Sequence, residues 1–311
     1  MLDVKRLRVL REVAAKGSFS AAAESLAYTQ SAVSQQIAAL EREAQTKLVE
    51  RSARGVRLTE AGRALVKHAD AILARLADAE AELEAIAGLR GGRLRLVSFP
   101  TAAATVMPRA ISVFRERHPF VELSLEPAEP PEALEKLRAG ACDIALTIDA
   151  PFAAEESEGV DKVHLLDDPM YVALPIAHPL AQAPEVRLEQ LASDPWIGGL
   201  SGGHPDALIV LRACHAAGFE PRIAFHSDDY LAIQGFIAAG MGVSLIPDLA
   251  LLATRDDVAI RSVAGSAPFR TVQAATMQGV YRSPAVDAML SVLLEVCDEF
   301  AAQRRELALA S

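Results

Sequence analysis

Four polar side chains at short spacing have the chemistry needed to bind nucleic acid. They are Gln30, Ser31, Ser34 and Gln35. A glutamine amide can bridge N6 and N7 of adenine, and a serine hydroxyl can pair with several base edges in the major groove. These side chains therefore predict contact with base edges, provided that one rigid element presents them together.

A helix from residue 30 to about residue 43 would be that element. Thr29 precedes it and is a good N-cap, and we include Thr29 among the DNA-contacting residues. Apolar residues recur at helical spacing on the opposite face: Val33, Ile37 and Leu40. The pattern predicts the second helix of a helix-turn-helix, the helix that enters the major groove.

The preceding residues predict two short helices that support this one. An apolar stripe runs through Leu7, Leu10 and Val13, and Gly17 ends that helix. Ser18 can cap the next helix, predicted at residues 21–26. Because a helix N-terminus attracts anions, Ser18 and Ser20 are candidate phosphate contacts.

A small hairpin, or wing, is predicted next, at residues 48–58. Two extended pieces flank residues 53–55, and the segment carries Arg51, Arg54 and Arg57. These arginines suit phosphate or minor-groove contact. Any one of the polar residues taken singly is more often a solvated surface residue. The turn spacing, the wing and the charge taken together favour DNA.

The charge distribution supports a basic head on an acidic body. The net charge is −10 over 311 residues, which by itself argues against a nucleic-acid partner. Residues 1–67, however, contain 12 Lys and Arg against 7 Asp and Glu. The remaining residues carry the opposite balance, −15. This asymmetry is expected when one end of a chain meets phosphate.

A long helix, capped by Thr59 and running to about Leu89, is predicted after the wing. Its apolar residues are spaced alternately by four and three: Leu65, Ala69, Ile72, Leu76, Ala79, Leu83 and Ile86. Such a heptad seam needs a partner helix, and a second copy of the chain is the favoured partner. The alternative is an amphipathic helix packed on its own body. Gly88, Gly91 and Gly92 then predict a hinge.

Beyond the hinge, strands and helices alternate, which predicts α/β architecture with largely parallel sheets. The predicted strands lie at 94–98, 121–125, 144–148, 171–174, 223–226 and 243–246. The predicted helices lie at 107–117, 131–139, 206–217, 231–239 and 284–300. Some 215 residues are many for one α/β unit, so two lobes are expected.

Candidate ligand residues follow from this architecture, because ligands of α/β sheets lie beyond the carboxyl ends of strands. One group follows the first predicted strand: Ser98, Phe99, Pro100 and Thr101. Thr147 ends another strand. The loop 200–204, with Leu200, Ser201 and Gly202, precedes a helix, so its amides could bind an anion. A plain turn is the alternative for that loop.

Two segments resemble the DNA-binding region of LysR-type transcriptional regulators: GSFSAAAESLAYTQSAVSQQIAALE and LVERSARGVRLTEAG. That resemblance spans residues 2–90. The remainder resembles the family's effector domain, which is similar to type 2 periplasmic binding proteins. Its signals include Met107-Pro108 and the run from Gly240 through Met241 to Pro247. Tyr28, Ala44, Gln45 and Val49 depart from the family pattern, and the family's glycine is missing at position 45.

The resemblance implies an all-α winged helix-turn-helix at residues 1–60 and a linker helix at 60–90. It also implies an effector domain at 91–305, with one lobe at 93–164 and 268–305 and the other at 165–267. A small organic acid or another metabolite would bind between the lobes, at the residues named above and Met241. The regulator would be a homodimer, paired into a tetramer on double-stranded DNA, and could contact RNA polymerase.

Other classes of protein fit less well. The seven histidines show no metal-ligand spacing and no HExxH motif or P-loop occurs, so we expect no catalysis, metal or cofactor. A thiol switch using Cys142 or Cys214 stays open, although both read as small buried hydrophobes. Odd, widely spaced cysteines and the lack of a signal-peptide core predict a cytoplasmic protein, not a solute-binding one. The uncharged stretch 230–247 contains Gln234 and three glycines, which indicates a buried helix and strand, not a membrane span.

Overall fold

The structure is a computed structural model that describes residues 2–52, 55–86, 92–149, 159–198 and 205–310. It divides into two compact units. One contains Met1–Arg93 with Lys136–Cys142, and the other contains Leu94–Glu135 with Asp143–Ser311. The domain and lobe boundaries expected from the sequence stay predictions. In the described part of the chain, no helix is both long and apolar enough to cross a membrane.

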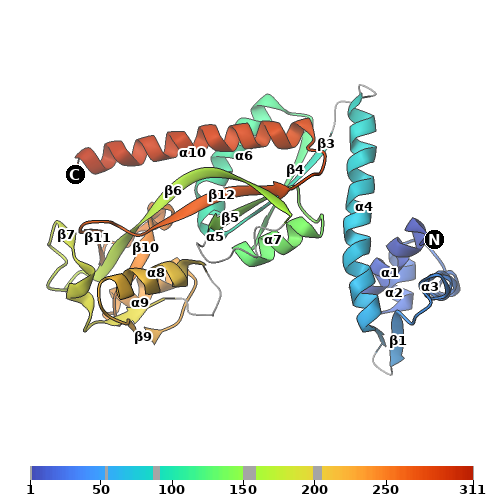
Figure 1. Cartoon of the computed structure of the whole chain (residues 1–311), viewed down its shortest axis with the longest axis horizontal. Helices are drawn as coiled ribbons and strands as arrows, with labels where there is room; N and C mark the ends of the chain where they lie inside the picture. The colour runs from blue at the N-terminus through green and yellow to red at the C-terminus, as the bar shows by residue number, and fades with distance from the viewer. Residues whose placement is uncertain (1, 53–54, 87–91, 150–158, 199–204, 311) are drawn as a thin grey trace. The chain divides into compact units, whose positions relative to one another are not determined.

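The first unit contains four helices and a hairpin in the described residues (Figure 1). In chain order they are α1 Val4–Lys16, α2 Phe19–Ser25, α3 Gln30–Ala44, β1 Val49–Ser52, β2 Gly55–Leu58 and α4 Glu60–Ile86. The three-helix head and the wing are therefore present as predicted, with α2 beginning two residues earlier than expected. The predicted end of α4 at Leu89, and Gly88 and Gly91 of the predicted hinge, lie outside the described residues.

Side-chain caps fix where these helices begin. The Ser18 hydroxyl accepts a hydrogen bond from the Ala21 amide at 3.5 Å, and the Thr29 hydroxyl accepts one from the Ala32 amide at 3.2 Å. The Thr59 hydroxyl accepts the Gly62 amide at 3.0 Å. Each cap satisfies an amide that the first turn of a helix leaves without a partner, so all three predicted caps are confirmed.

The helices of the head share one apolar core. The predicted stripes of α1 and α3 both lie in it, together with Leu48 from the start of the wing and Ala69 from α4. The six stripe residues are Leu7, Leu10, Val13, Val33, Ile37 and Leu40, each at most 2% exposed. Burial of this many aliphatic side chains is the main stabilising term for so small a unit.

Backbone and carboxylate contacts fix the path from α3 to the wing. The Glu41 carboxylate accepts the amides of Leu48 at 3.0 Å and Val49 at 3.3 Å, and pairs with Lys47 at 2.9 Å. Burial alone would raise the pKa of Glu41, but these hydrogen bonds outweigh it and lower that pKa. The Val56 amide also donates to the Gly17 carbonyl at 2.9 Å, which ties β2 to the turn between α1 and α2.

The seam of α4 is buried near the start of the helix and exposed further along it. Ala69 is fully buried and Leu65 packs against the core of the head. Further along, Ile72, Leu76 and Leu83 are 42%, 45% and 66% exposed, and Ala79 is exposed as well. Figure 1 shows that α1, α2 and α3 lie beside the N-terminal part of α4 only. The side chain of Ile86 lies outside the described residues.

The second unit is built on a sheet of order β4-β3-β5-β12-β6-β11-β7, with β10 paired to β6. A separate two-stranded sheet joins β8 and β9. The strands are β3 Gly92–Ser98, β4 Val121–Pro127, β5 Ile144–Asp149, β6 Val160–Pro175, β7 Glu185–Val186, β8 Pro195–Ile197, β9 Arg222–Phe225, β10 Ser244–Pro247, β11 Val258–Val263 and β12 Phe269–Met277.

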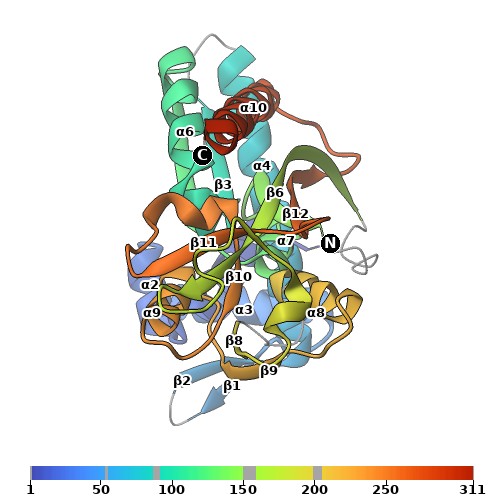
Figure 2. The same ribbon diagram turned by 90° about the vertical axis from the view of Figure 1, so that its left-hand side faces the viewer.

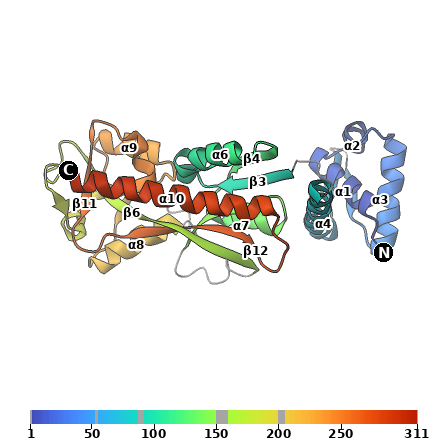
Figure 3. The ribbon, with the colours of Figure 1, turned by 90° about the horizontal axis from the view of Figure 1, so that it is seen from above.

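Helices cover both faces of this sheet. The helices are α5 Pro100–Ala104, α6 Val106–Arg117, α7 Pro130–Arg138, α8 Pro205–Ala216, α9 Tyr230–Ala238 and α10 Pro284–Ala310, with 3-10 turns η2 Leu188–Leu191 and η3 Asp248–Ala253. Figure 2 shows α8 and α9 on either side of β10, and Figure 3 shows α10 running along β6 and β12. One large core lies under α6 and α10, and another surrounds Trp196.

The expectation of largely parallel sheets is wrong. Strand β12 is antiparallel to both β5 and β6, and β10 and β11 are antiparallel to β6. Parallel pairing is found for β3 with β5, β11 with β7 and β8 with β9. The error comes from two crossing strands: only residues 171–174 of β6 were predicted, and β12 was missed because Arg270, Thr271 and Gln273 interrupt its apolar pattern.

Replacing Gln45 by glycine is expected to stabilise the head. Gln45 ends α3 with φ of 53°, in the left-handed region that costs a side chain free energy. After allowing for the greater freedom of glycine in the unfolded chain, Gln45→Gly should raise the free energy of unfolding by about 0.5–1 kcal/mol. Urea denaturation followed by circular dichroism measures this change.

The matched control is Ala38→Gly, an exposed position in the interior of the same helix. It should lower the free energy of unfolding by about 1 kcal/mol, the usual helical penalty for glycine. If both glycines destabilise alike, the left-handed backbone at Gln45 is not a source of strain.

Candidate nucleic-acid interface and ligand site

Helix α3 has a polar exposed face and an apolar buried one. Gln30, Ser31 and Gln35 are exposed, whereas Ser34 is half-buried. The Thr29 hydroxyl lies 3.0 Å from the Ser31 hydroxyl in addition to capping the helix. The structure therefore brings most of the predicted base-contacting side chains to one accessible surface at the start of α3.

The neighbouring glutamine, Gln36, has a different environment. Its amide oxygen accepts a hydrogen bond from the Arg6 guanidinium at 3.2 Å, and Arg6 also pairs with Glu43. These contacts hold α1 against α3 within the head. Gln35 and Gln36 are thus adjacent in sequence, but one faces solvent while the other joins two helices.

The remaining predicted phosphate contacts differ in accessibility. Ser20 and Arg57 are exposed, whereas Ser18 is half-buried and engaged as a cap. Arg54 and the side chain of Arg51 lie outside the described residues. Sequence reasoning did not include Tyr28, which is 49% exposed one residue before the Thr29 cap. Only its departure from the family pattern could have drawn attention to it.

The residues predicted after the first strand begin α5. Ser98 and Phe99 are buried at the end of β3, Thr101 is half-buried, and Pro100 is exposed at the first position of α5. Leu200, Ser201 and Gly202 lie outside the described residues. Residues 199–203 read G-L-S-G-G, which is the G-x-S-x-G spacing of hydrolase nucleophiles.

A buried charge cluster lies next to Thr101. The guanidinium of Arg270 on β12 is 1% exposed and pairs with Asp168 of β6 and with Asp206 of α8. Its Nη1 lies 2.9 Å from Asp206 Oδ2, and its Nη2 donates to the Thr101 hydroxyl at 3.0 Å. One guanidinium therefore connects three elements that are far apart in the sequence.

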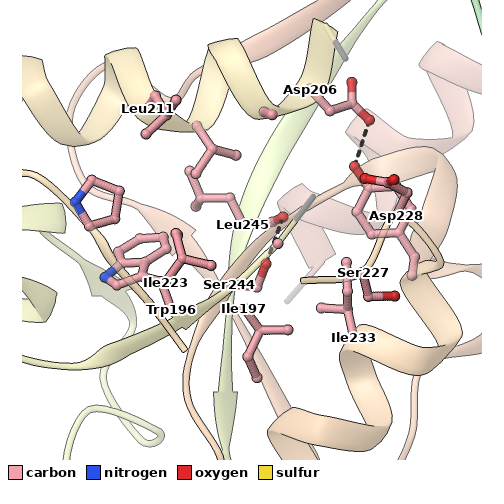
Figure 4. Close-up of a pocket in the computed structure, with 15 residues that line it drawn as sticks. Trp196, Ile197, Asp206, Leu211, Ile223, Ser227, Asp228, Ile233, Ser244 and Leu245 are labelled. Carbon is pink, nitrogen blue, oxygen red and sulfur yellow. Dashed lines mark hydrogen bonds between the residues drawn. The ribbon is translucent and has the colours of Figure 1, made fainter. Parts of the chain in front are cut away.

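Two aromatic side chains complete this cluster. The Tyr230 hydroxyl, at the start of α9, donates to Asp206 Oδ2 at 2.7 Å (Figure 4), and the Arg270 guanidinium lies 5.4 Å from the centre of the Phe99 ring. Burial, together with the nearby Asp206 carboxylate, raises the pKa of Tyr230 well above its usual value. Two carboxylates therefore share one guanidinium.

Sequence reasoning missed this cluster. Nothing in the local sequence links Asp168, Asp206 and Arg270. The usable signal was Arg270 itself, the one charged residue in Phe269–Met277, since a buried charge requires a partner.

Thr147 and Met241 lie apart from the residues around Arg270. The register pairs Thr147 of β5 with Gln273 of β12, and side chains alternate along a strand. Thr147 and Gln273 therefore project from the face opposite to Arg270, each with a buried oxygen that lacks a hydrogen-bond partner. Met241 follows the end of α9 and is 45% exposed. Within the described ranges, no group of three or more His, Cys, Asp or Glu side chains could hold a metal ion.

Comparison with known proteins identifies both parts of the chain. Residues 4–63 match the family "Bacterial regulatory helix-turn-helix protein, lysR family", and residues 87–298 match "LysR substrate binding domain". The "Probable HTH-type transcriptional regulator LrrA" of Synechococcus elongatus is 32% identical over 96% of this chain and 98% of its own. The "Probable hydrogen peroxide-inducible genes activator" of Mycobacterium avium is 36% identical over 86% of this chain and 85% of its own.

A solved structure shares the fold. Full-length CbnR in complex with its target DNA superposes with a TM-score of 0.73 at 23% identity, over 95% of this chain and all of that one. At this level of identity the likeness concerns the fold alone.

Substituting Arg270 is expected to destabilise the second unit strongly. Arg270→Met keeps much of the side-chain volume but leaves Asp168 and Asp206 buried without their cation. Removing one partner of a buried ion pair typically costs about 3–5 kcal/mol. Urea denaturation followed by the fluorescence of Trp196, the one tryptophan, measures the change.

Arg255→Met is the control, because Arg255 pairs with Asp257 at 2.8 Å on the exposed surface. The denaturation midpoint of this variant should match that of the native chain. Equal midpoints for Arg270→Met and the native chain would show that the buried cluster contributes little to stability.

Proposed function

This chain belongs to the LysR family of transcriptional regulators, and from that membership we propose how it recognises DNA and responds to its effector. It is a DNA-binding regulator with an effector-binding domain, not an enzyme. We propose that the exposed face of α3 reads the base edges of a duplex. The observation that carries this proposal is the division of α3 into an exposed face with Gln30, Ser31 and Gln35 and a buried apolar face.

The side chains on that face fit the major groove. An exposed glutamine can form two hydrogen bonds with one adenine, and serine pairs with several base edges. We assign base contacts to Gln30, Ser31, Ser34 and Gln35, with Thr29 as the cap that orients them. The exposed Ser20 and Arg57, with Ser18, Arg51 and Arg54, are assigned to the phosphate backbone, which fixes the position of the head on the duplex.

The seam of α4 is assigned to a homodimer. Past the core of the head, the seam leaves Ile72, Leu76 and Leu83 exposed at heptad spacing. A second copy of the helix would cover them by packing knobs into holes. Two heads joined in this way would contact two half-sites of an interrupted inverted repeat, and pairing of dimers would give a tetramer.

The second unit is assigned to sensing. We propose that a small molecule binds near Ser98, Phe99, Pro100 and Thr101, with the loop 200–202 contributing. Differential affinity of this ligand for two arrangements of the lobes would shift their populations and alter DNA bending or polymerase contact. Supporting this proposal is the position of Thr101, which is hydrogen-bonded to Arg270 beside the start of α8.

A thiol switch is not favoured for this chain. Cys142, Cys214 and Cys297 are all buried. Burial raises the pKa of Cys214 and of Cys297 to about 12, which leaves almost no thiolate to react with an oxidant at neutral pH.

The DNA proposal predicts different effects for Gln35, Gln36 and Arg57. Gln35→Ala should weaken binding to DNA from upstream of the chain's own gene by about 1–3 kcal/mol, with relaxed preference at one base pair. Arg57→Ala should weaken binding to all sequences and reduce the salt slope by about one. Gel shifts over a range of salt concentrations measure both changes.

Gln36→Ala is the matched control, since it removes an amide that binds Arg6 instead of facing solvent. It should leave base preference unchanged. The proposal fails if the folded native chain does not bind this DNA at low salt, or if Gln36→Ala relaxes base preference and Gln35→Ala does not.

The dimer proposal predicts that Leu76→Glu dissociates the protein, because a carboxylate on the seam would be buried without a partner. Analytical ultracentrifugation should show about a tenfold or larger rise in the dissociation constant, equivalent to about 1.4 kcal/mol or more. The control is Ala77→Glu, at the next exposed position and off the seam. Equal dissociation by the two variants would contradict an interface along the seam.

A further inference from the structure

An exposed tyrosine lies in the turn between α2 and α3. Tyr28 is 49% exposed, and the apolar core of the head does not include it. The side-chain caps of the two helices come from Ser18 and Thr29, so Tyr28 has no part in capping them. Residues 27–31 are all exposed. Tyr28 therefore extends the accessible surface at the start of α3 without contributing to the interior of the head.

Hydrogen bonds fix the backbone on both sides of Tyr28. The Tyr28 amide donates to the Ala23 carbonyl at 2.8 Å, and the Ala27 amide donates to the Glu24 carbonyl at 3.2 Å. Because Ala27 is left-handed, with φ of 54°, this pair of bonds forms the Schellman arrangement that ends many helices. On the other side of Tyr28, Thr29 caps α3. The turn therefore holds the tyrosine in a defined place before any partner binds.

The helix-turn-helix determines where this turn would lie on a duplex. In such a motif the N-terminal residues of the second helix contact base edges in the major groove, and the first helix crosses the phosphate backbone. In this chain those helices are α3 and α2. The turn that joins them passes from the backbone to the groove, so its exposed side chains would lie at the edge of the groove. Phosphate oxygens line that edge.

The chemistry of a tyrosine suits a phosphate oxygen. Its hydroxyl donates one hydrogen bond, and tyrosine is among the side chains that bind the DNA backbone in this way. Its few side-chain torsions also mean that ordering it costs less conformational entropy than ordering a lysine or an arginine. A phenol carries no charge at neutral pH. Such a contact would therefore add affinity without releasing a counterion from the DNA.

We propose that Tyr28 anchors the head to the DNA backbone, with its hydroxyl donating to a phosphate oxygen at the edge of the groove that α3 enters. The inference rests on the proposed function, to which it adds an uncharged backbone contact. Tyr28 thus differs from Gln35, which is assigned to a base, and from Arg57, which is assigned to an ionic contact.

The test separates the tyrosine hydroxyl from its ring. Tyr28→Phe removes only the oxygen, and Tyr28→Ala removes the ring as well. On the DNA used for Gln35→Ala, Tyr28→Phe should weaken binding about three- to tenfold, which is the effect of one hydrogen bond. The loss should be equal for all DNA sequences, and the slope of log affinity against log salt should match that of the native chain. Tyr28→Ala should lose at least as much affinity.

A modified duplex locates the partner of the hydroxyl. Phosphates of the binding site are replaced one at a time by uncharged methylphosphonates, and gel shifts measure the affinity of the native chain and of Tyr28→Phe for each duplex. At one position the two losses should be less than additive, because the second change removes a contact that the first has already weakened. At the other positions the losses should add.

Two controls accompany these measurements. Tyr281→Phe removes the same oxygen from an exposed tyrosine of the second unit, 62% exposed, and should leave DNA affinity unchanged. Urea denaturation followed by circular dichroism should give equal midpoints for Tyr28→Phe and the native chain, because the backbone hydrogen bonds of the turn do not involve the phenol.

Three results would overturn the inference. They are native affinity in Tyr28→Phe, a loss of affinity confined to one base pair, and losses that add at every phosphate. Each leaves the proposed function standing if the native chain binds this DNA and Gln35→Ala relaxes its base preference. Failure of the folded native chain to bind this DNA would instead contradict the proposed function itself.

Discussion

One buried guanidinium determines which elements of the second unit must lie next to one another. Arg270 cannot be buried without compensation, and its two carboxylates come from β6 and from the start of α8. The Thr101 hydroxyl and the Tyr230 hydroxyl then extend the hydrogen bonding to α5 and α9. An unpaired buried charge costs several kcal/mol. The cluster is therefore stable only when β6, β12 and the starts of these helices are all in place. The cluster therefore specifies where the start of each of these three helices lies relative to the crossing strands β6 and β12.

The head follows a different principle, in which apolar packing positions polar groups for a partner. Three aliphatic side chains of α3 enter the core, and that alone determines which side of the helix remains exposed. The contrast between Gln35 and Gln36 shows that the position on the helix decides which side chains are exposed. The side-chain amide of Gln35 faces solvent, whereas that of Gln36, one residue further along the helix, binds the Arg6 guanidinium. The wing is held by Glu41, whose carboxylate binds two amides at the start of β1.

Short sequence patterns predicted the features that depend on interactions between residues close in the sequence. The caps at Ser18, Thr29 and Thr59 and the aliphatic stripes of α1 and α3 could be read from the sequence, because side chains within a few residues determine them. The long crossing strands could not, because polar residues such as Thr271 and Gln273 break the apolar alternation of β12. The cluster around Arg270 joins residues up to 169 positions apart, as Thr101 and Arg270 are, and no short-range pattern encodes such a contact. The residues proposed to contact bases could be predicted from the sequence for the opposite reason, since the one helix α3 carries Gln30, Ser31, Ser34 and Gln35.

The contacts of Glu41 have a mechanical consequence for the duplex. One carboxylate on α3 binds the first amides of the wing, and the Val56 amide binds back to the turn after α1. In the proposed complex, these hydrogen bonds fix the distance between α3 in the major groove and the wing on the sugar-phosphate backbone. Two contact points at a fixed distance cannot adapt to local differences in groove width. The protein would therefore prefer DNA sites whose base-pair steps deform easily, so that the groove adopts the width that this distance requires. Such a preference would extend to base pairs that no side chain touches.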